Sequence, residues 1–370
     1  MSGGRRMIRK FTGIVLLLGL LQSCTHTTNV IRIGVAGPMT GDQSVFGRDE
    51  RRGVKLAVRE WNHKGGLLGR KIELIVEDDQ HDPRQAVIVA NRLVTDGVAG
   101  VIGHFNSNCS IPASAVYHRA GIPMISHGST NPQLTEQGFR NVFRVCGRDD
   151  QQARVAADFV CKTLNLSRIA IIQDKTTYGQ GIADEFRRWL STACKVVYYG
   201  TIIQGDKDFH AVLTNVKAQT PDLIYFGGIY PEGGLLVKQA RQLGIKALFM
   251  GGDGIMGPEF ITIAGSASSG VYATFGPDIN KVPSAQQFIE SYRKLYGEPG
   301  PYSVYAYVAA NILLSAIKEC GSTKPSVLIA YLHAHSFDTA LGTIAFDNNG
   351  DVVHSPYVIW QVRNGRFVQL

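Results

Sequence analysis

Two hydroxyl-rich turns stand where apolar runs end. Ser107 follows the run at 100–103, just ahead of an expected helix with a proline near its start, and Thr130 follows the run at 123–126. Backbone N–H groups at a helix start are free of intrahelical partners, and with nearby hydroxyls they favour an anion. These turns predict a site for a carboxylate. Either turn alone is more often an N-cap, but their occurrence after neighbouring strands favours a functional reading.

An acidic side chain stands at a third such position. Asp253 follows the run at 247–250, and the flanking Gly252 and Gly254 allow a ligand to approach the backbone closely. Tyr178, after a further apolar run, offers an aromatic face. The carboxylate turns and Asp253 together predict a site for an amino acid zwitterion, because each end of the ligand then meets its complementary group.

These positions depend on an α/β architecture. Short apolar runs alternate with amphipathic stretches of helical period, which is typical of parallel sheets with helices on both faces. The alternation occurs in two series, so we expect two α/β lobes, with ligands bound at the carboxyl ends of the strands. Expected strands are 31–36, 71–77, 100–103, 123–126, 169–173, 196–199, 223–226 and 247–250. Expected helices include 51–61, 112–120, 151–164, 182–190, 209–218 and 235–243, followed by 284–296, 302–320, 325–334 and a hairpin across Asn364-Gly365.

The N-terminus predicts export. Four basic residues within the first ten precede an apolar run at 11–21, which is typical of a signal peptide and is too short for a membrane anchor. The sequence Leu21-Gln22-Ser23-Cys24 resembles a lipoprotein cleavage site, so we expect residues 1–23 to be removed and Cys24 to be lipidated, with cleavage near Ser23 and a soluble product as the alternative.

Composition and motifs exclude several function classes. The net charge of +8 includes the four basic residues of the first ten, and the small excess that remains forms no nucleic-acid footprint. The segment 252–257 matches G-x-G-x-x-G, but it occurs late in the chain and before a short helix, so we do not expect a dinucleotide. The segment 347–351 resembles a calcium loop but lacks the required glycine and twelfth-position ligand. No nucleophile, metal or cofactor motif is present, so we expect neither an enzyme nor a cofactor.

The cysteines do not form an obvious set of pairs. Besides Cys24 there are five, an odd number without C-x-x-C spacing: Cys109, Cys146, Cys161, Cys194 and Cys320. A bridge from Cys161 to Cys194 is conceivable in an oxidising compartment, but isolated buried cysteines are the more frequent outcome, so the sequence assigns no disulfide pairing.

Several segments resemble the leucine/isoleucine/valine-binding proteins that serve bacterial ABC importers. The similarity extends from about residue 31 to about residue 351, and its motifs occur in the family's order: Asp78-Asp79-Gln80-His81-Asp82-Pro83-Arg84-Gln85-Ala86, Val101-Ile102-Gly103-His104, Asp206-Lys207-Asp208-Phe209 and Phe249-Met250-Gly251-Gly252-Asp253-Gly254. The resemblance implies the type I periplasmic-binding fold, with two lobes that are joined by a three-strand hinge and close on the ligand. It implies a first lobe of residues 30–147 plus 278–356 and a second lobe of 148–277 plus 357–370.

The resemblance also implies roles for individual residues. Ser107 and Thr130 would hold the ligand carboxylate, the Gly128 carbonyl and Asp253 its ammonium, and Tyr178 would cover it from the second lobe. Three positions depart from the family's usual residues. Asp253 is one methylene shorter than the usual glutamate, and Phe46 and Ile229 replace tyrosines, with Tyr230 available beside Ile229. The pocket is therefore expected to be more apolar than is usual in the family.

The sequence thus predicts a monomeric, extracytoplasmic solute-binding protein that is tethered to a membrane through Cys24. It would capture an amino acid with a branched or other apolar side chain and deliver it to an ABC permease. Two alternatives remain open: the same fold could bind urea or short amides, or it could act as a ligand-sensing module.

Overall fold

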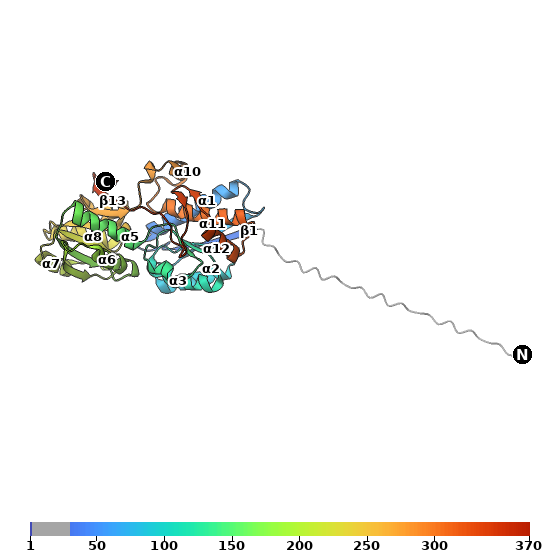
Figure 1. The fold of residues 1–370 in the computed structure, drawn as a ribbon, viewed down its shortest axis with the longest axis horizontal. Coiled ribbons are helices and arrows are strands. Elements are labelled where there is room, and N and C mark those ends of the chain that lie inside the picture. Colours follow the sequence, from blue (N-terminus) through green and yellow to red (C-terminus); the bar gives the residue numbers. More distant parts are fainter. Residues whose placement is uncertain (2–29) are drawn as a thin grey trace.

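The computed structural model describes Met1 and residues 30–370; the predicted signal peptide and Cys24 lie outside these residues. The chain forms two α/β lobes that lie side by side, with the N-terminal strand in one lobe and the C-terminal hairpin in the other (Figure 1). The expected two-lobe α/β architecture is confirmed.

The first lobe is built on a five-stranded parallel sheet of order β2-β1-β3-β4-β5. Its strands are β1 (Val30–Gly37), β2 (Lys71–Asp78), β3 (Val101–Gly103), β4 (Met124–Ser126) and β5 (Val142–Arg144). Alternate residues of β1 face two separate apolar clusters, since Ile33 packs with α1 and α11 and Ala36 packs with α2 and α3. The helices of this lobe are α1 (Ser44–His63), α2 (Pro83–Thr95), α3 (Ser107–Ala120), α4 (Gln133–Glu136), α10 (Gln286–Tyr296), α11 (Ser303–Cys320) and α12 (Pro325–Ala334). A small hairpin of β11 (Phe337–Thr339) and β12 (Gly342–Ile344) follows them.

The second lobe contains a seven-stranded sheet of order β14-β13-β10-β9-β8-β6-β7. Its strands are β6 (Arg168–Gln173), β7 (Lys195–Thr201), β8 (Leu223–Gly227), β9 (Leu248–Gly251), β10 (Tyr272–Phe275), β13 (Val358–Arg363) and β14 (Arg366–Gln369). Its helices are α5 (Asp149–Asp158), α6 (Thr177–Trp189), α7 (His210–Ala218), α8 (Tyr230–Gln242) and α9 (Pro258–Ala264). The predicted hairpin is confirmed: Arg363 pairs with Arg366, and Asn364 and Gly365 both have positive φ, as a tight two-residue turn requires.

Several expected bounds were wrong for local reasons. Helix α3 begins at Ser107 rather than at Pro112, so the proline lies inside the helix. The expected helix 151–164 is α-helical only to Asp158 and continues as a π-helix over Phe159–Thr163. Strands β5 and β10, of three and four residues, were not expected.

The described residues contain one disulfide, whose pairing the sequence left open. Cys161 in the π-helix and Cys194 ahead of β7 form a disulfide with Cα atoms 6.1 Å apart. Cys109, Cys146 and Cys320 are free thiols, the first two buried. Sequence spacing could not identify the pair, because the two positions are 33 residues apart and meet only through packing within one apolar cluster of the second lobe.

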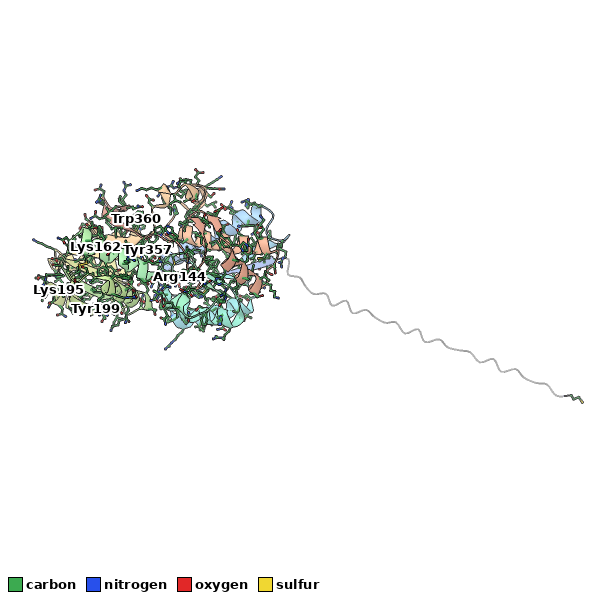
Figure 2. All side chains as sticks on the ribbon, in the orientation of Figure 1. Arg144, Lys162, Lys195, Tyr199, Tyr357 and Trp360 are labelled. Atoms are coloured by element: carbon green, nitrogen blue, oxygen red, sulfur yellow. A yellow bond between two sulfur atoms is a disulfide. The ribbon has the colours of Figure 1, made fainter. Side chains whose placement is uncertain are left out.

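The chain passes between the lobes three times: between β5 and α5, after β10, and before β13. Figure 2 labels Tyr357 and Trp360, which come from the last of these passages and the strand that follows it. Among residues 30–370, no helix combines the length and apolar character needed to span a bilayer.

Candidate functional site

The predicted site residues meet between the lobes around two small cavities. One has a volume of about 20 Å³ and is lined by Phe105, Asn106, Ser107, Gly128, Tyr178, Ile229, Asp253, Gly254 and Tyr302. The other, of about 10 Å³, shares Asp253 and Tyr302 and is lined further by Thr130, His127, Cys146, Phe275, Tyr305 and Tyr357. Each cavity has room for about one water molecule, so an amino acid can be accommodated only if the lobes or the side chains between them move.

The carboxylate end of the predicted site lies on the first lobe. Ser107 is the first residue of α3, after Asn106 at the N-cap position, and is 2% exposed. Its hydroxyl accepts a weak hydrogen bond from Asn131 N at 3.4 Å. Thr130 is equally buried, and its hydroxyl has no hydrogen-bond partner among the described residues. A free hydroxyl and a helix N-terminus at a buried site suit a carboxylate ligand.

The carboxylate of Asp253 lies on the second lobe, in the short turn after β9. Oδ1 accepts hydrogen bonds from the Tyr178 hydroxyl at 2.8 Å and Gln152 Nε2 at 3.1 Å, and Oδ2 accepts one from the Tyr302 hydroxyl at 2.9 Å. All three donors are neutral, and no ion pair to Asp253 occurs among the described residues. Burial raises the pKa of Asp253 above its ordinary value, and the three donors lower it in part. The ammonium group of a ligand would supply the missing countercharge.

A second buried carboxyl group, that of Asp149, lies near Asp253. Asp149 begins α5, is fully buried, and has no hydrogen-bond partner for either oxygen among the described residues. Burial, together with the nearby charge of Asp253, raises the pKa of Asp149 well above its ordinary value. The raised pKa favours the protonated, neutral form of Asp149 and leaves Asp253 as the carboxylate for a ligand ammonium.

Aromatic rings form the apolar wall of the site. Phe46 stacks on Phe105 with centroids 4.4 Å apart, and it makes edge contacts with Tyr230 at 5.1 Å and Tyr302 at 5.3 Å. Phe105 also meets Tyr302 edge-on at 4.7 Å. This cluster joins rings from both lobes, because Tyr230 begins α8 and the others belong to the first lobe. It favours an apolar ligand side chain.

Gly128 is required by close packing against this wall. A Cβ atom at residue 128 would lie 2.5 Å from the ring of Phe105, closer than a real side chain allows. Ile229 is 5% exposed and lines the larger cavity. Tyr230 does not line either cavity; its hydroxyl donates a hydrogen bond across the lobes to the Asp42 carbonyl.

Sequence reasoning missed three residues of the site. Tyr302 follows the loop 298–301 rather than a strand, and Gln152 lies within a helix. Phe105 is an apolar residue between polar neighbours, so a search for polar side chains did not select it. A search limited to polar side chains at strand ends could not find them. His127, which lines the smaller cavity, is fully buried, and burial lowers its pKa to about 3.

The segment 347–351 is a turn, as the sequence analysis predicts. Asp347 Oδ1 accepts hydrogen bonds from the backbone of Asn349 and Asp351. The Asp351 carboxylate pairs with Arg144 at 2.5 Å and Arg148 at 2.8 Å, so it is neutralised by arginine; Arg144 is labelled in Figure 2. The residues that the structure describes contain no cluster of His, Cys, Asp and Glu suited to a metal ion.

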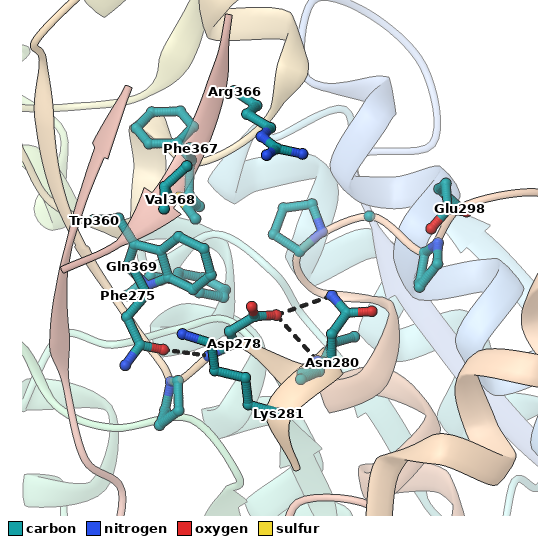
Figure 3. A pocket seen from close by; sticks show the side chains of 16 residues that line it. Phe275, Asp278, Asn280, Lys281, Glu298, Trp360, Arg366, Phe367, Val368 and Gln369 are labelled. Atoms are coloured by element: carbon teal, nitrogen blue, oxygen red, sulfur yellow. Dashed lines mark hydrogen bonds between the residues drawn. The ribbon is translucent and has the colours of Figure 1, made fainter. Parts of the chain in front are cut away.

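A larger, open pocket lies beside the crossover after β10. It has a volume of about 440 Å³ and lies between the β13–β14 hairpin, residues 277–281 and the loop 298–301 (Figure 3). Asp278 there accepts hydrogen bonds from Asn280, and Gln369 Oε1 accepts one from Asp278 N. None of the predicted ligand-binding residues lines this open pocket.

Comparisons with known proteins agree with this architecture. The family model described as periplasmic binding protein matches residues 30–366. An amino acid binding protein of Pseudomonas aeruginosa is 40% identical over 99% of both chains, and Leu/Ile/Val-binding protein homolog 2 of Brucella abortus is 41% identical over 96% of both. The structure of a branched-chain amino acid transporter substrate-binding protein of Streptococcus pneumoniae in complex with isoleucine has a TM-score of 0.85 at 30% identity and covers 92% of this chain and 100% of that one. The two-lobed chain belongs to the periplasmic binding protein family and is a solute-binding protein.

Proposed function

We propose that this protein captures an apolar α-amino acid, with branched-chain side chains favoured, and delivers it to the permease of an ABC importer. The observation that carries the proposal is the buried Asp253 carboxylate, which has three neutral donors and no countercharge among the described residues. The relatives named above, which are described as binding amino acids or Leu, Ile and Val, support the ligand class.

The proposed pose satisfies both charges of the ligand. The carboxylate lies at the start of α3 against the hydroxyls of Ser107 and Thr130, and the ammonium lies between Asp253 and the Gly128 carbonyl. Tyr178 closes over the ligand from the second lobe. The ligand side chain packs against the rings of Phe46, Phe105 and Tyr302 and against Ile229.

Capture involves separation and closure of the lobes about the three crossovers. Cavities of about 20 Å³ and 10 Å³ cannot admit an amino acid while the lobes are in contact. Asn131 Nδ2 donates to the Thr177 carbonyl at 2.8 Å and Lys207 pairs with Asp42 at 3.2 Å, and both contacts cross between the lobes. We propose that these contacts break on opening and re-form around the ligand.

The protein is proposed to act outside the cytoplasm as a monomer, held to the membrane by lipid at Cys24. Membership in the periplasmic binding protein family supports the compartment. The anchor is supported by the lipoprotein-like sequence that ends at Cys24.

Isothermal calorimetry on refolded protein tests the ligand class. Leucine, isoleucine and valine are expected to bind, whereas N-acetyl-leucine, which lacks the ammonium, and leucinamide, which lacks the carboxylate, are expected to bind at least a hundredfold more weakly. Binding of urea or acetamide without binding of any amino acid would contradict the proposal.

A further inference from the structure

The outward face of α1 carries a row of basic side chains. Arg51, Lys55 and Arg59 repeat at four-residue spacing and are exposed, so they lie on one face of the helix. Arg52 lies beside them, with its guanidinium 5.4 Å from the ring centroid of Tyr296. None of these positions belongs to the ligand site.

The acidic residues of α1 do not neutralise this row. Asp49 is 4% exposed and Glu50 is 0% exposed, so both face the protein interior. Glu60 accepts a hydrogen bond from the Tyr307 hydroxyl at 2.6 Å. Within the part of the chain that the structure describes, no acidic side chain lies within 4.0 Å of the charged groups of Arg51, Lys55 or Arg59. The row therefore presents unneutralised positive charge to solvent.

An open groove with an apolar floor runs between this row and the edge strand β2. It has a volume of about 720 Å³, and Val58, Leu74, Val76 and Tyr296 contribute its apolar surface. Val76 is 38% exposed, which is unusual for a valine of a parallel sheet. The three acidic residues of β2 interact elsewhere: Glu73 pairs with Arg32, Glu77 pairs with Arg92, and Asp78 accepts a hydrogen bond from Met39 N at 2.9 Å. The groove thus combines cationic side chains with exposed aliphatic surface.

The chain enters the first lobe close to this surface. Val30 begins β1 and pairs with Lys71, which begins β2, the strand that borders the groove. Figure 1 shows that β1 begins at the end of the first lobe farthest from the second lobe. Cys24 precedes Val30 by six residues, which can span at most about 20 Å. A lipid at Cys24 would therefore hold this end of the lobe near the bilayer.

We propose that the basic face of α1 and the adjoining groove bind the surface of an anionic phospholipid bilayer. Lys and Arg side chains near such a surface are attracted to lipid phosphates, and exposed aliphatic groups can enter the headgroup region. The contact would act with the lipid anchor as a second membrane signal and would orient the first lobe on the bilayer. It does not depend on the identity of the transported ligand.

Vesicle sedimentation tests the proposal on a chain that begins at residue 25, so that neither the apolar segment 11–21 nor a Cys24 lipid contributes. Wild type is expected to bind vesicles that contain phosphatidylglycerol and not to bind vesicles of pure phosphatidylcholine. Added salt is expected to release it from the phosphatidylglycerol vesicles. The variant Arg51→Gln/Lys55→Gln/Arg59→Gln is expected to bind roughly a hundredfold more weakly, since each basic side chain contributes about fivefold. The matched control Lys217→Gln/Lys238→Gln/Lys246→Gln removes the same charge from exposed positions of the second lobe and is expected to bind as wild type does.

Two further measurements test whether a bilayer surface, rather than a small anion or an acidic polymer, is what binds the basic row and its groove. Val76→Ser is expected to weaken vesicle binding while amino acid affinity, which reports correct folding, stays unchanged. Glycerol phosphate and polyglutamate are expected to compete poorly, because neither offers a surface of both charge and apolar groups. Three outcomes would overturn the proposal. They are an equal loss of vesicle binding in the two triple variants, unchanged vesicle binding in the α1 variant, and tighter binding of polyglutamate than of vesicles.

Discussion

The Tyr302 hydroxyl donates a hydrogen bond to Asp253 Oδ2 over 2.9 Å, and this bond joins the two lobes. Tyr302 is the N-cap residue of α11 in the first lobe, whereas Asp253 follows β9 in the second. The aspartate thus has a partner from the opposite lobe at the position where a ligand ammonium is proposed to bind. Closure of the lobes therefore adds a hydrogen bond to Asp253, while its charge is left for the ligand ammonium to neutralise.

Replacing Asp253 by asparagine is expected to weaken amino acid binding about a hundredfold or more, because the ligand ammonium loses its buried countercharge. Calorimetry measures the loss. The melting temperature is expected to stay the same or rise, since burial disfavours the ionised carboxylate. Asp208→Asn, at an exposed loop carboxylate, serves as the control with unchanged affinity. Undiminished affinity in Asp253→Asn would contradict the zwitterion site.

Ligand affinity is expected to fall on acidification, and to begin falling above the ordinary carboxyl range. Burial raises the pKa of Asp253 in the folded protein, and the ligand ammonium requires the ionised form. In the ligand-free protein, the raised pKa of Asp253 changes the free energy of unfolding with pH in the opposite direction. Its contribution to stability is greatest below the pKa of the unfolded state and is lost as the pH rises through the pKa of the folded state.

Tyr302→Phe sharpens this test, because it removes the donor and keeps the ring. The Tyr302 hydrogen bond lowers the pKa of Asp253, so the variant should lose affinity at a higher pH than wild type does. Calorimetry from about pH 4 to about pH 8 measures both profiles. His127 does not contribute in this range, because burial lowers its pKa to about 3. Superimposable profiles for the two proteins would show that the hydrogen bond does not act on the binding carboxylate.

Opening the Cys161–Cys194 disulfide is expected to destabilise the second lobe without changing ligand affinity. The bridge closes a loop with a sequence separation of 33, and its loss should lower the free energy of unfolding by about 3 kcal/mol. Thermal melts of Cys161→Ala/Cys194→Ala, with and without reductant, measure the effect. The double variant should no longer respond to reductant, whereas the control Cys320→Ala, at a free cysteine, should melt as wild type does and keep its response to reductant.

The buried Arg144–Asp351 pair is expected to be structural. Arg144 is fully buried and also donates hydrogen bonds to the carbonyls of Ser129 and Asn131, on either side of Thr130. Asp351→Asn should therefore lower the free energy of unfolding by about 3 kcal/mol, because it leaves a buried guanidinium partly unpaired. Asp347→Asn, in the same turn, is the milder comparison. Calcium should not raise the melting temperature of wild type, and a calcium-dependent rise would contradict the assignment of a turn.

Most second-lobe elements and the hairpin were predicted from their apolar runs and turn residues, whereas β10 and the π-helix at the end of the expected helix 151–164 were not. Ser107, Thr130 and Asp253 were found by the rule that parallel strands meet at their carboxyl ends. The start of α3 was missed because Pro112 was taken as a first-turn residue, and a proline in the sixth position is tolerated here within a buried helix.

Tertiary contacts could not be predicted in the same way. The donor from Tyr302 comes from a loop far along the chain, and the stacking of Phe46 on Phe105 depends on how α1 packs over the first sheet. The Cys161–Cys194 pair depends on a π-helix that no sequence period indicated. Each of these features results from packing between elements, which residue spacing alone does not encode.

Trp360 gives the protein an intrinsic optical reporter. Its indole Nε1 donates a hydrogen bond to the Gly276 carbonyl at 2.9 Å, in the crossover after β10. Trp61 instead bonds Asn311 within the first lobe, and Trp189 is 38% exposed at the end of α6. Of the three tryptophans, only Trp360 contacts a segment that must change its backbone angles when the lobes rotate. Its emission therefore allows closure to be timed in a stopped-flow fluorimeter without any attached dye.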